Sequence, residues 1–135
     1  MIYTTSHRIL ESQIDSTGHL SNVQYYAFFK SAFYEFLNEN NFVDLVSPKN
    51  LWPIVFHENC SFKKELYFNE TIEIKFYFTD LSSKHNKWTA QFIMYDDSMN
   101  EVAIYESHHG ILDKDTRKIS SLPQAAIDLV NRYMK

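Results

Sequence analysis

The sequence predicts an α+β protein in which one antiparallel sheet wraps around a long central helix. Two observations lead to this prediction. A stretch of about 16 residues that begins near Ser21 is apolar around most of a helical surface, and most of the chain after it has the pattern of long strands in succession. A buried helix beside a sheet with one apolar face is stable when the sheet curls around the helix and covers it.

Length and composition indicate a single domain over residues 1–135. The chain is long enough to enclose a core, and 16% of its residues are aromatic. A formal net charge of -4 argues against a nucleic-acid-binding surface. Cys60, the one cysteine, has no partner for an internal disulfide, and there is neither a signal peptide nor an apolar span of ~20 residues. We therefore expect a cytoplasmic protein that does not enter a membrane.

The first part of the chain should form a strand, a turn and the central helix. Residues 2–14 have the mixed polarity of an extended segment, and residues 15–18 are Asp, Ser, Thr and Gly, all of which favour turns. Ser21 and Gln24 have the spacing of a capping box, which predicts the start of the helix. The poor helix formers at 38–41 predict its end.

Four strands are expected in succession after the helix. In one of them, apolar residues from Ile72 to Phe78 alternate with polar residues, which is typical of a sheet with one buried face. Successive strands with short connections imply antiparallel pairing. Together with the central helix, this is the hotdog arrangement. The strands are predicted at 53–68, 70–81, 87–96 and 101–113, before a short amphipathic helix at about 123–134.

The turn before the central helix has the residue types of an acyl-transfer site. Asp15 would lie beside the first N–H groups of the helix, which lack partners within the helix and carry the positive end of its dipole. Such amides stabilise an oxyanion while the carboxylate attacks or activates water. Gly18 is one of only two glycines and permits a tight backbone path. The alternative for Asp15 is a purely structural role in the turn.

Three segments of the sequence resemble hotdog acyl-CoA thioesterases of the 4-hydroxybenzoyl-CoA thioesterase type. The stretch DSTGHLSNVQY at 15–25 is similar to the family signature D-x-x-G-H-V-x-N-x-x-Y. The stretch HENCSFKKELYFNETIEI at 57–74 is similar to the second and third strands of the family. The stretch HHGILDKDTRKISSLP at 108–123 is similar to its last strand and tail. In all, the resemblance covers about residues 5–125.

The resemblance implies a role for each residue of the signature. Asp15 matches the catalytic aspartate, which acts as nucleophile or general base. The backbone N–H of Asn22 matches the group that donates to the thioester carbonyl, and His19 matches the signature histidine. Gly18 matches the glycine that lets the loop approach the thioester.

The function implied by the resemblance is hydrolysis of an acyl-CoA thioester to free acid and CoA, without a metal or redox cofactor. From their positions in the helix, we expect Tyr25 to line an acyl pocket, with Phe29 behind it. The resemblance also implies a homodimer or homotetramer with shared active sites. The sequence specifies neither the acyl group nor whether the carrier is CoA or acyl carrier protein.

Several positions depart from the family pattern. Gln13 stands where a second aspartate is common, and Glu65 stands where a proline is common. Two other functions therefore stay open: a non-catalytic acyl-CoA-binding module, and a hotdog hydratase or dehydratase. The second usually has a histidine with an acidic residue on the central helix, whereas this helix has no histidine and only Glu35 near its far end.

The remaining histidines have a simpler interpretation. His57 and Glu58 are adjacent on a strand and point to opposite faces, so we assign both to structure. His108 and His109 diverge in the same way and have no cluster of carboxylates beside them. The sequence therefore predicts no metal site.

Overall fold

Five strands and three α-helices make up the computed structural model, which describes all residues, 1–135. Short 3-10 turns lie at Glu11–Gln13 and Ser47–Lys49. None of the helices is long and apolar enough to cross a membrane. The elements follow in the order β1 (Tyr3–Arg8), α1 (Asn22–Glu39), α2 (Phe42–Val46), β2 (Leu51–Phe62), β3 (Thr71–Leu81), β4 (Lys87–Tyr95), β5 (Glu101–Asp113) and α3 (Gln124–Arg132).

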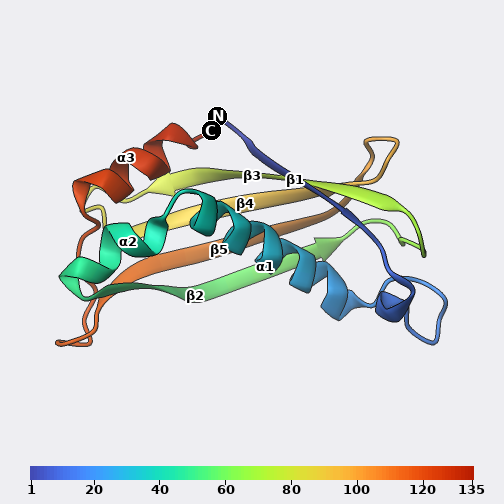
Figure 1. Ribbon diagram of the computed structural model, residues 1–135, viewed down its shortest axis with the longest axis horizontal. Coiled ribbons are helices and arrows are strands. Elements are labelled where there is room, and N and C mark those ends of the chain that lie inside the picture. Colours follow the sequence, from blue (N-terminus) through green and yellow to red (C-terminus); the bar gives the residue numbers. More distant parts are fainter.

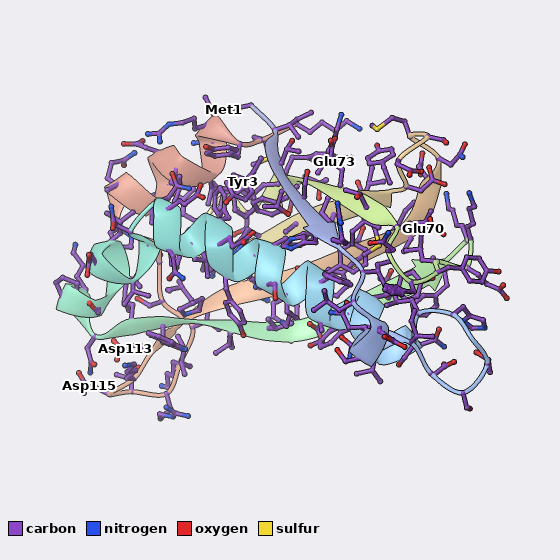
Figure 2. The ribbon with its side chains drawn as sticks, turned by 45° about the vertical axis from the view of Figure 1, so that its right-hand side comes forward. Met1, Tyr3, Glu70, Glu73, Asp113 and Asp115 are labelled. Carbon is purple, nitrogen blue, oxygen red and sulfur yellow. The ribbon has the colours of Figure 1, made fainter.

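The strands form one antiparallel sheet in the order β1-β3-β4-β5-β2. Helix α1 lies across one face of this sheet, with α2 at one of its ends and the loop that precedes it at the other (Figure 1). This confirms the predicted hotdog fold. The side-chain view shows Tyr3 of β1 near α3, whereas Asp113 and Asp115 mark the turn that follows β5 at a distant corner (Figure 2).

The core is a layer of aromatic rings between α1 and the sheet. Phe36 of α1 packs edge-on against Phe76 of β3, with ring centroids 4.7 Å apart. Phe33 meets Phe92 of β4 at 5.9 Å, and Phe29 stacks on a ring of β5 at 5.3 Å. These rings are buried or nearly so, and they fix both the height and the rotation of the helix over the sheet.

Helix α1 is buried on one face only, which differs from the expectation of burial almost all round. Val23 is 70% exposed and Tyr34 is 57% exposed, although both are apolar or aromatic. The reason is geometric. A single sheet covers one side of the helix, and nothing in the isolated chain covers the other side.

Element boundaries differ from the prediction at β1 and β2. Strand β1 ends at Arg8 and a 3-10 turn follows at Glu11–Gln13, so the extended segment expected at 2–14 is too long. Strand β2 starts at Leu51 and ends at Phe62, so the expected continuation to residue 68 is wrong. After Phe62 the chain turns away and both Lys63 and Lys64 donate their N–H groups to the carbonyl oxygen of Val102. The five-residue helix α2 was not predicted, because its length is too short for a helical period to show.

Strand β2 is one edge of the sheet and carries exposed apolar side chains. A register shift between Val55 and His57 marks a bulge in its pairing with β5. Phe56 lies at this bulge and is 55% exposed. Its ring stays in contact with the cation of Lys87, 5.7 Å from the centroid. The edge thus offers both unpaired backbone groups and apolar surface.

Replacement of Phe36 by alanine should strongly destabilise the fold. Its ring is fully buried and touches aromatic rings of β1, of β3 and of Tyr133 just after α3, so truncation should cost about 3–5 kcal/mol of unfolding free energy. Tyr34→Ala is the matched control on the exposed face of the same helix and should cost far less. Urea denaturation of both variants checks this, and equal losses would contradict the assignment of the buried face.

Candidate active site

A tight loop places Asp15 directly before α1. Ile14 and Leu20 form an isolated antiparallel bridge that closes the loop. The N–H of Asp15 donates to the carbonyl oxygen of His19, and the N–H of Gly18 donates to the carbonyl oxygen of Asp15, both at 3.1 Å. Gly18 has a φ of +89°, a left-handed conformation that other residues rarely adopt. The glycine is therefore needed for the turn itself.

The carboxylate of Asp15 is exposed and ionised. Its Oδ1 accepts hydrogen bonds from the hydroxyl of Thr17 and from the N–H of Thr17, the latter at 2.8 Å. These two bonds lower the pKa of Asp15 below its ordinary value, because they stabilise the charged form. At neutral pH the loop that precedes α1 thus carries a negative charge at Asp15.

The first turn of α1 has no side-chain cap. The predicted capping box is wrong, because the side chain of Ser21 bonds to none of the helix N–H groups. Ser21 is instead held through its backbone: its N–H donates to Gln13 at 3.3 Å, and its carbonyl oxygen accepts from Gln24 at 2.9 Å. The N–H of Asn22, the first helical residue, is left without a helical partner at the positive end of the dipole.

A cavity of about 310 Å³ opens beside this helix start. Three of the predicted site residues, His19, Asn22 and Tyr25, contribute to its wall. Asp15 and Gly18 lie in the adjoining loop rather than on the wall. The complete lining is His19, Leu20, Asn22, Tyr25, Phe62, Lys63, Lys64 and Glu65.

Two hydrogen bonds and one longer polar contact hold the polar wall of this cavity. Nδ1 of His19 lies 3.3 Å from the carbonyl oxygen of Leu20, and Nε2 of His19 lies 3.7 Å from a carboxylate oxygen of Glu65. The Tyr25 hydroxyl donates to the carbonyl oxygen of Lys64 at 2.9 Å. Burial raises the pKa of Tyr25 to about 12, so this hydroxyl keeps its proton.

Two lysines bring positive charge to the rim. Lys63 pairs with Glu101 at 3.2 Å, and Lys64 pairs with the buried carboxylate of Asp96 at 2.5 Å. The bond from Lys64 lowers the pKa of Asp96 to about 2, with help from the N–H of Asn100. Asp96 therefore anchors Lys64 to the β4–β5 turn, while the Lys64 side chain stays half exposed.

Phe29 does not reach the cavity. Its side chain is fully buried and stacks on Tyr105 of β5, one helical turn beyond Tyr25. Phe29 packs between α1 and the sheet, inside the core.

A polar cluster between α1 and β2 was not predicted as a site. Glu58 accepts hydrogen bonds from the hydroxyls of Tyr26 (3.1 Å) and Tyr105 and pairs with Lys30 at 3.0 Å. Burial raises the pKa of Glu58, but the bonds from Tyr105 and Lys30 outweigh it and leave the pKa lowered. The one indication of this cluster in the sequence is the alternation of side chains along β2, which places Glu58 on the side that faces the helix.

The two adjacent histidines of β5 face opposite sides of the sheet. His108 lies on the outer side, 2.9 Å from a carboxylate oxygen of Glu106. His109 is buried against α1 and stacks on Trp88. No three His, Cys, Asp or Glu residues are placed so that they could hold a metal ion together.

Comparison with known proteins identifies the family. The model of the thioesterase-like superfamily matches residues 10–129, so the chain belongs to this superfamily. No curated protein gives a significant match to the sequence.

Solved structures share the fold over nearly the whole chain. A hypothetical protein from Staphylococcus aureus in complex with CoA has a TM-score of 0.87 at 12% identity, covering 100% of this chain and 87% of that chain. A 1,4-dihydroxy-2-naphthoyl-CoA thioesterase from Synechocystis has a TM-score of 0.85 at 15% identity, covering 97% and 96%. The probable thioesterase YbaW from Escherichia coli has a TM-score of 0.86 at 16% identity, covering 98% and 99%.

Substitution of Gly18 should reveal backbone strain in the loop. A Cβ added at this position would meet no atom within 4 Å, so the cost comes from the positive φ alone. Gly18→Ala should lower the unfolding free energy by about 1–2 kcal/mol. Gly18→Asn is the control and should cost less, because asparagine tolerates left-handed conformations. Thermal unfolding measures both; an equal stability of the two variants and the wild type would argue against the strained turn.

Proposed function

We propose that this protein hydrolyses an acyl-CoA thioester to a free acid and CoA. One observation carries the proposal: an ionised carboxylate, Asp15, precedes an uncapped helix start in a chain of the thioesterase-like superfamily. The CoA complex of the Staphylococcus aureus structure supports a CoA thioester as the ligand. Cys60 is a free thiol, which is consistent with a reaction in the cytoplasm.

In the proposed reaction, Asp15 supplies the negative oxygen. As a general base, it takes a proton from water, whose oxygen bonds to the thioester carbonyl carbon. As a nucleophile, its own oxygen forms that bond and gives a mixed anhydride, which water then cleaves. In both routes the C–S bond breaks and the thiolate of CoA leaves and takes up a proton.

The helix start stabilises the charge that develops on the carbonyl oxygen. The N–H of Asn22 donates to this oxygen, and the dipole of α1 adds positive potential at the same point. His19 adds a hydrogen-bonding imidazole on the cavity wall. All of these groups belong to the chain itself, so the reaction needs water but no metal or redox cofactor.

The other predicted residues position the substrate. Gly18 lets the loop approach the thioester without the bulk of a Cβ. Tyr25 forms the wall of the cavity, and Phe29 holds the helix beneath it. At the rim, Lys63 and Lys64 are placed to meet the phosphates of CoA, although each already has a carboxylate partner.

A non-catalytic acyl-CoA-binding module is the second candidate, and one observation favours it. The Asp15 carboxylate is engaged by Thr17 and is not part of the cavity wall. A hydratase is disfavoured, because α1 carries no histidine beside its acidic residues. Glu35 of α1 is half exposed, and the histidine near it, His7, lies 3.9 Å away on β1.

We also propose that the active form is a homodimer or homotetramer with shared active sites. The free edge of β2 exposes apolar residues such as Phe56, and the uncovered face of α1 exposes others such as Tyr34. A second copy that pairs along β2 would extend the sheet and cover this edge.

Asp15→Asn should abolish thioester hydrolysis without unfolding the protein. Loss of the charged oxygen should lower kcat/KM by roughly 10²–10⁴-fold, measured as thiol release over short, long, aromatic and charged acyl-CoAs. Because the pKa of Asp15 is lowered, wild-type activity should hold level as the pH falls from 7 to about 5 and decline only as the carboxylate protonates.

Glu11→Gln, in the turn just before the loop, is the matched control and should keep full activity. Retained CoA binding by the inactive Asp15→Asn variant would show that the cavity is intact. If the wild type cleaves none of these thioesters yet binds CoA, the hydrolase proposal fails and the binding module takes its place.

Phe56→Lys should weaken the assembly. A lysine on the exposed β2 edge places a charge where a second copy would pair. Sedimentation velocity should show a dimer or larger species for the wild type and a shift toward the monomer for the variant. A wild type that sediments as a monomer at micromolar concentration would contradict the proposed assembly.

A further inference from the structure

The proposed reaction needs a source for one more proton, because the thiolate of CoA takes up a proton as it leaves. Three residues on the wall of the cavity at the helix start hold their protons firmly. Lys63 and Lys64 are paired with carboxylates, and the bond to Asp96 raises the pKa of Lys64. The Tyr25 hydroxyl, whose pKa is about 12, donates to a carbonyl oxygen. None of these three groups releases a proton readily at neutral pH.

His19 is the remaining titratable donor on this wall. An imidazole gains and loses a proton close to neutral pH, which suits this side chain to proton transfer. The other histidine that lines a cavity, His109, lies at the far end of α1, and burial lowers its pKa to about 3, so that its ring stays neutral. Among the donors at the helix start, His19 therefore combines the position and the chemistry of an acid for the leaving group.

The two nitrogens of the His19 ring face two different acceptors. Nδ1 lies 3.3 Å from the carbonyl oxygen of Leu20, and because a carbonyl oxygen only accepts, this contact places a proton on Nδ1. Nε2 lies 3.7 Å from Oε1 of Glu65. At this distance the carboxylate faces Nε2 without a direct hydrogen bond, so Nε2 is free to reach a ligand. In the imidazolium form both nitrogens carry a proton, and each one faces an oxygen.

Glu65 is held in place beside His19 by a side chain and by the backbone. Its second oxygen, Oε2, accepts a hydrogen bond from the Tyr67 hydroxyl at 2.7 Å. This bond and the charge of Glu65 raise the pKa of Tyr67, so the hydroxyl keeps its proton and remains a donor. The N–H of Leu20 donates to the carbonyl oxygen of Leu66 at 2.7 Å, and both leucines are fully buried. This contact ties the residue after His19 to the residue after Glu65.

We propose that His19 donates the proton that the leaving thiolate takes up, and that Glu65 is the positioning residue that holds the imidazole for this step. The step depends on the proposed hydrolysis of a CoA thioester. As the C–S bond breaks, its electron pair passes to sulfur, the Nε2–H bond breaks and an S–H bond forms. The ring is left neutral, with its remaining proton on Nδ1 toward Leu20. Glu65 takes no proton, and the solvent returns one to Nε2 after the thiol has left.

Two substrates that differ in their thiol separate proton donation from a structural effect. Both carry the acyl group that the wild type cleaves fastest from CoA; one is the CoA thioester and the other is the thioester of thiophenol. Thiophenolate is a far weaker base than the thiolate of CoA, so it leaves without a proton. Loss of a proton donor should therefore slow hydrolysis of the CoA thioester and spare the phenyl thioester.

Glu65→Gln should lower kcat for the CoA thioester by roughly tenfold with KM little changed, and kcat for the phenyl thioester should stay near the wild-type value. His19→Gln should lower kcat for the CoA thioester by roughly 10²-fold with the same preference between the two substrates. Glu65→Asp keeps a carboxylate and should retain more activity than Glu65→Gln. Asp15→Asn, by contrast, should slow hydrolysis of both thioesters.

Glu106→Gln is the matched control, because Glu106 also lies beside a histidine, His108, but on the outer face of the sheet. This variant should hydrolyse both thioesters at wild-type rates. Circular dichroism checks the fold of each variant, and the Glu65 side chain is 61% exposed, so Glu65→Gln should fold.

The outcomes distinguish this step from the hydrolysis itself. If the wild type cleaves both thioesters and a folded Glu65→Gln or His19→Gln variant keeps the wild-type ratio of the two rates, the role of that residue is overturned and the hydrolase proposal stands. If the wild type cleaves no CoA thioester, both proposals fail.

Discussion

The packing of α1 onto the sheet through aromatic rings is the interaction on which the rest of the structure depends. Each buried ring removes 150–250 Å² from water, which at ~25 cal/mol per Å² corresponds to about 4–6 kcal/mol. A helix cap contributes only about 1 kcal/mol. Packing by Phe29, Phe33 and Phe36 therefore decides where the helix lies, and its first turn can remain uncapped and open to a ligand.

The same packing explains why the two ends of α1 differ. At the N-terminal end, polar groups of the loop and of residues 63–65 surround a cavity that holds charges and free amides. At the C-terminal end, α2 and the start of β2 surround an apolar cavity with a neutral imidazole in its wall. One helix thus separates a charged environment from a largely apolar one, with the core rings filling the space between them.

Much of the fold could be predicted from the sequence, because alternation along the strands and the aromatic pattern of α1 are local signals. The turn at Gly18 could be predicted for the same reason. Residues brought together from distant segments could not be: Glu58 meets Tyr105 through the pairing of β2 with β5, and it meets Lys30 through the packing of α1 against the sheet. The failed capping box at Ser21 has a similar cause, since the carbonyl of Gln13 holds its backbone in place.

The ion pair between Lys64 and Asp96 affects whether the loop at residues 15–25 can be transferred to another protein. Asp96 holds Lys64, and the Lys64 carbonyl oxygen holds the hydroxyl of Tyr25 in the first turns of α1. The β4–β5 turn, remote in sequence, therefore adds support to the helix start that the core packing has placed. A graft of the segment from Asp15 to Tyr25 onto another scaffold would transfer these residues without the contacts that align them. Such a graft therefore has to include the β4–β5 turn as well.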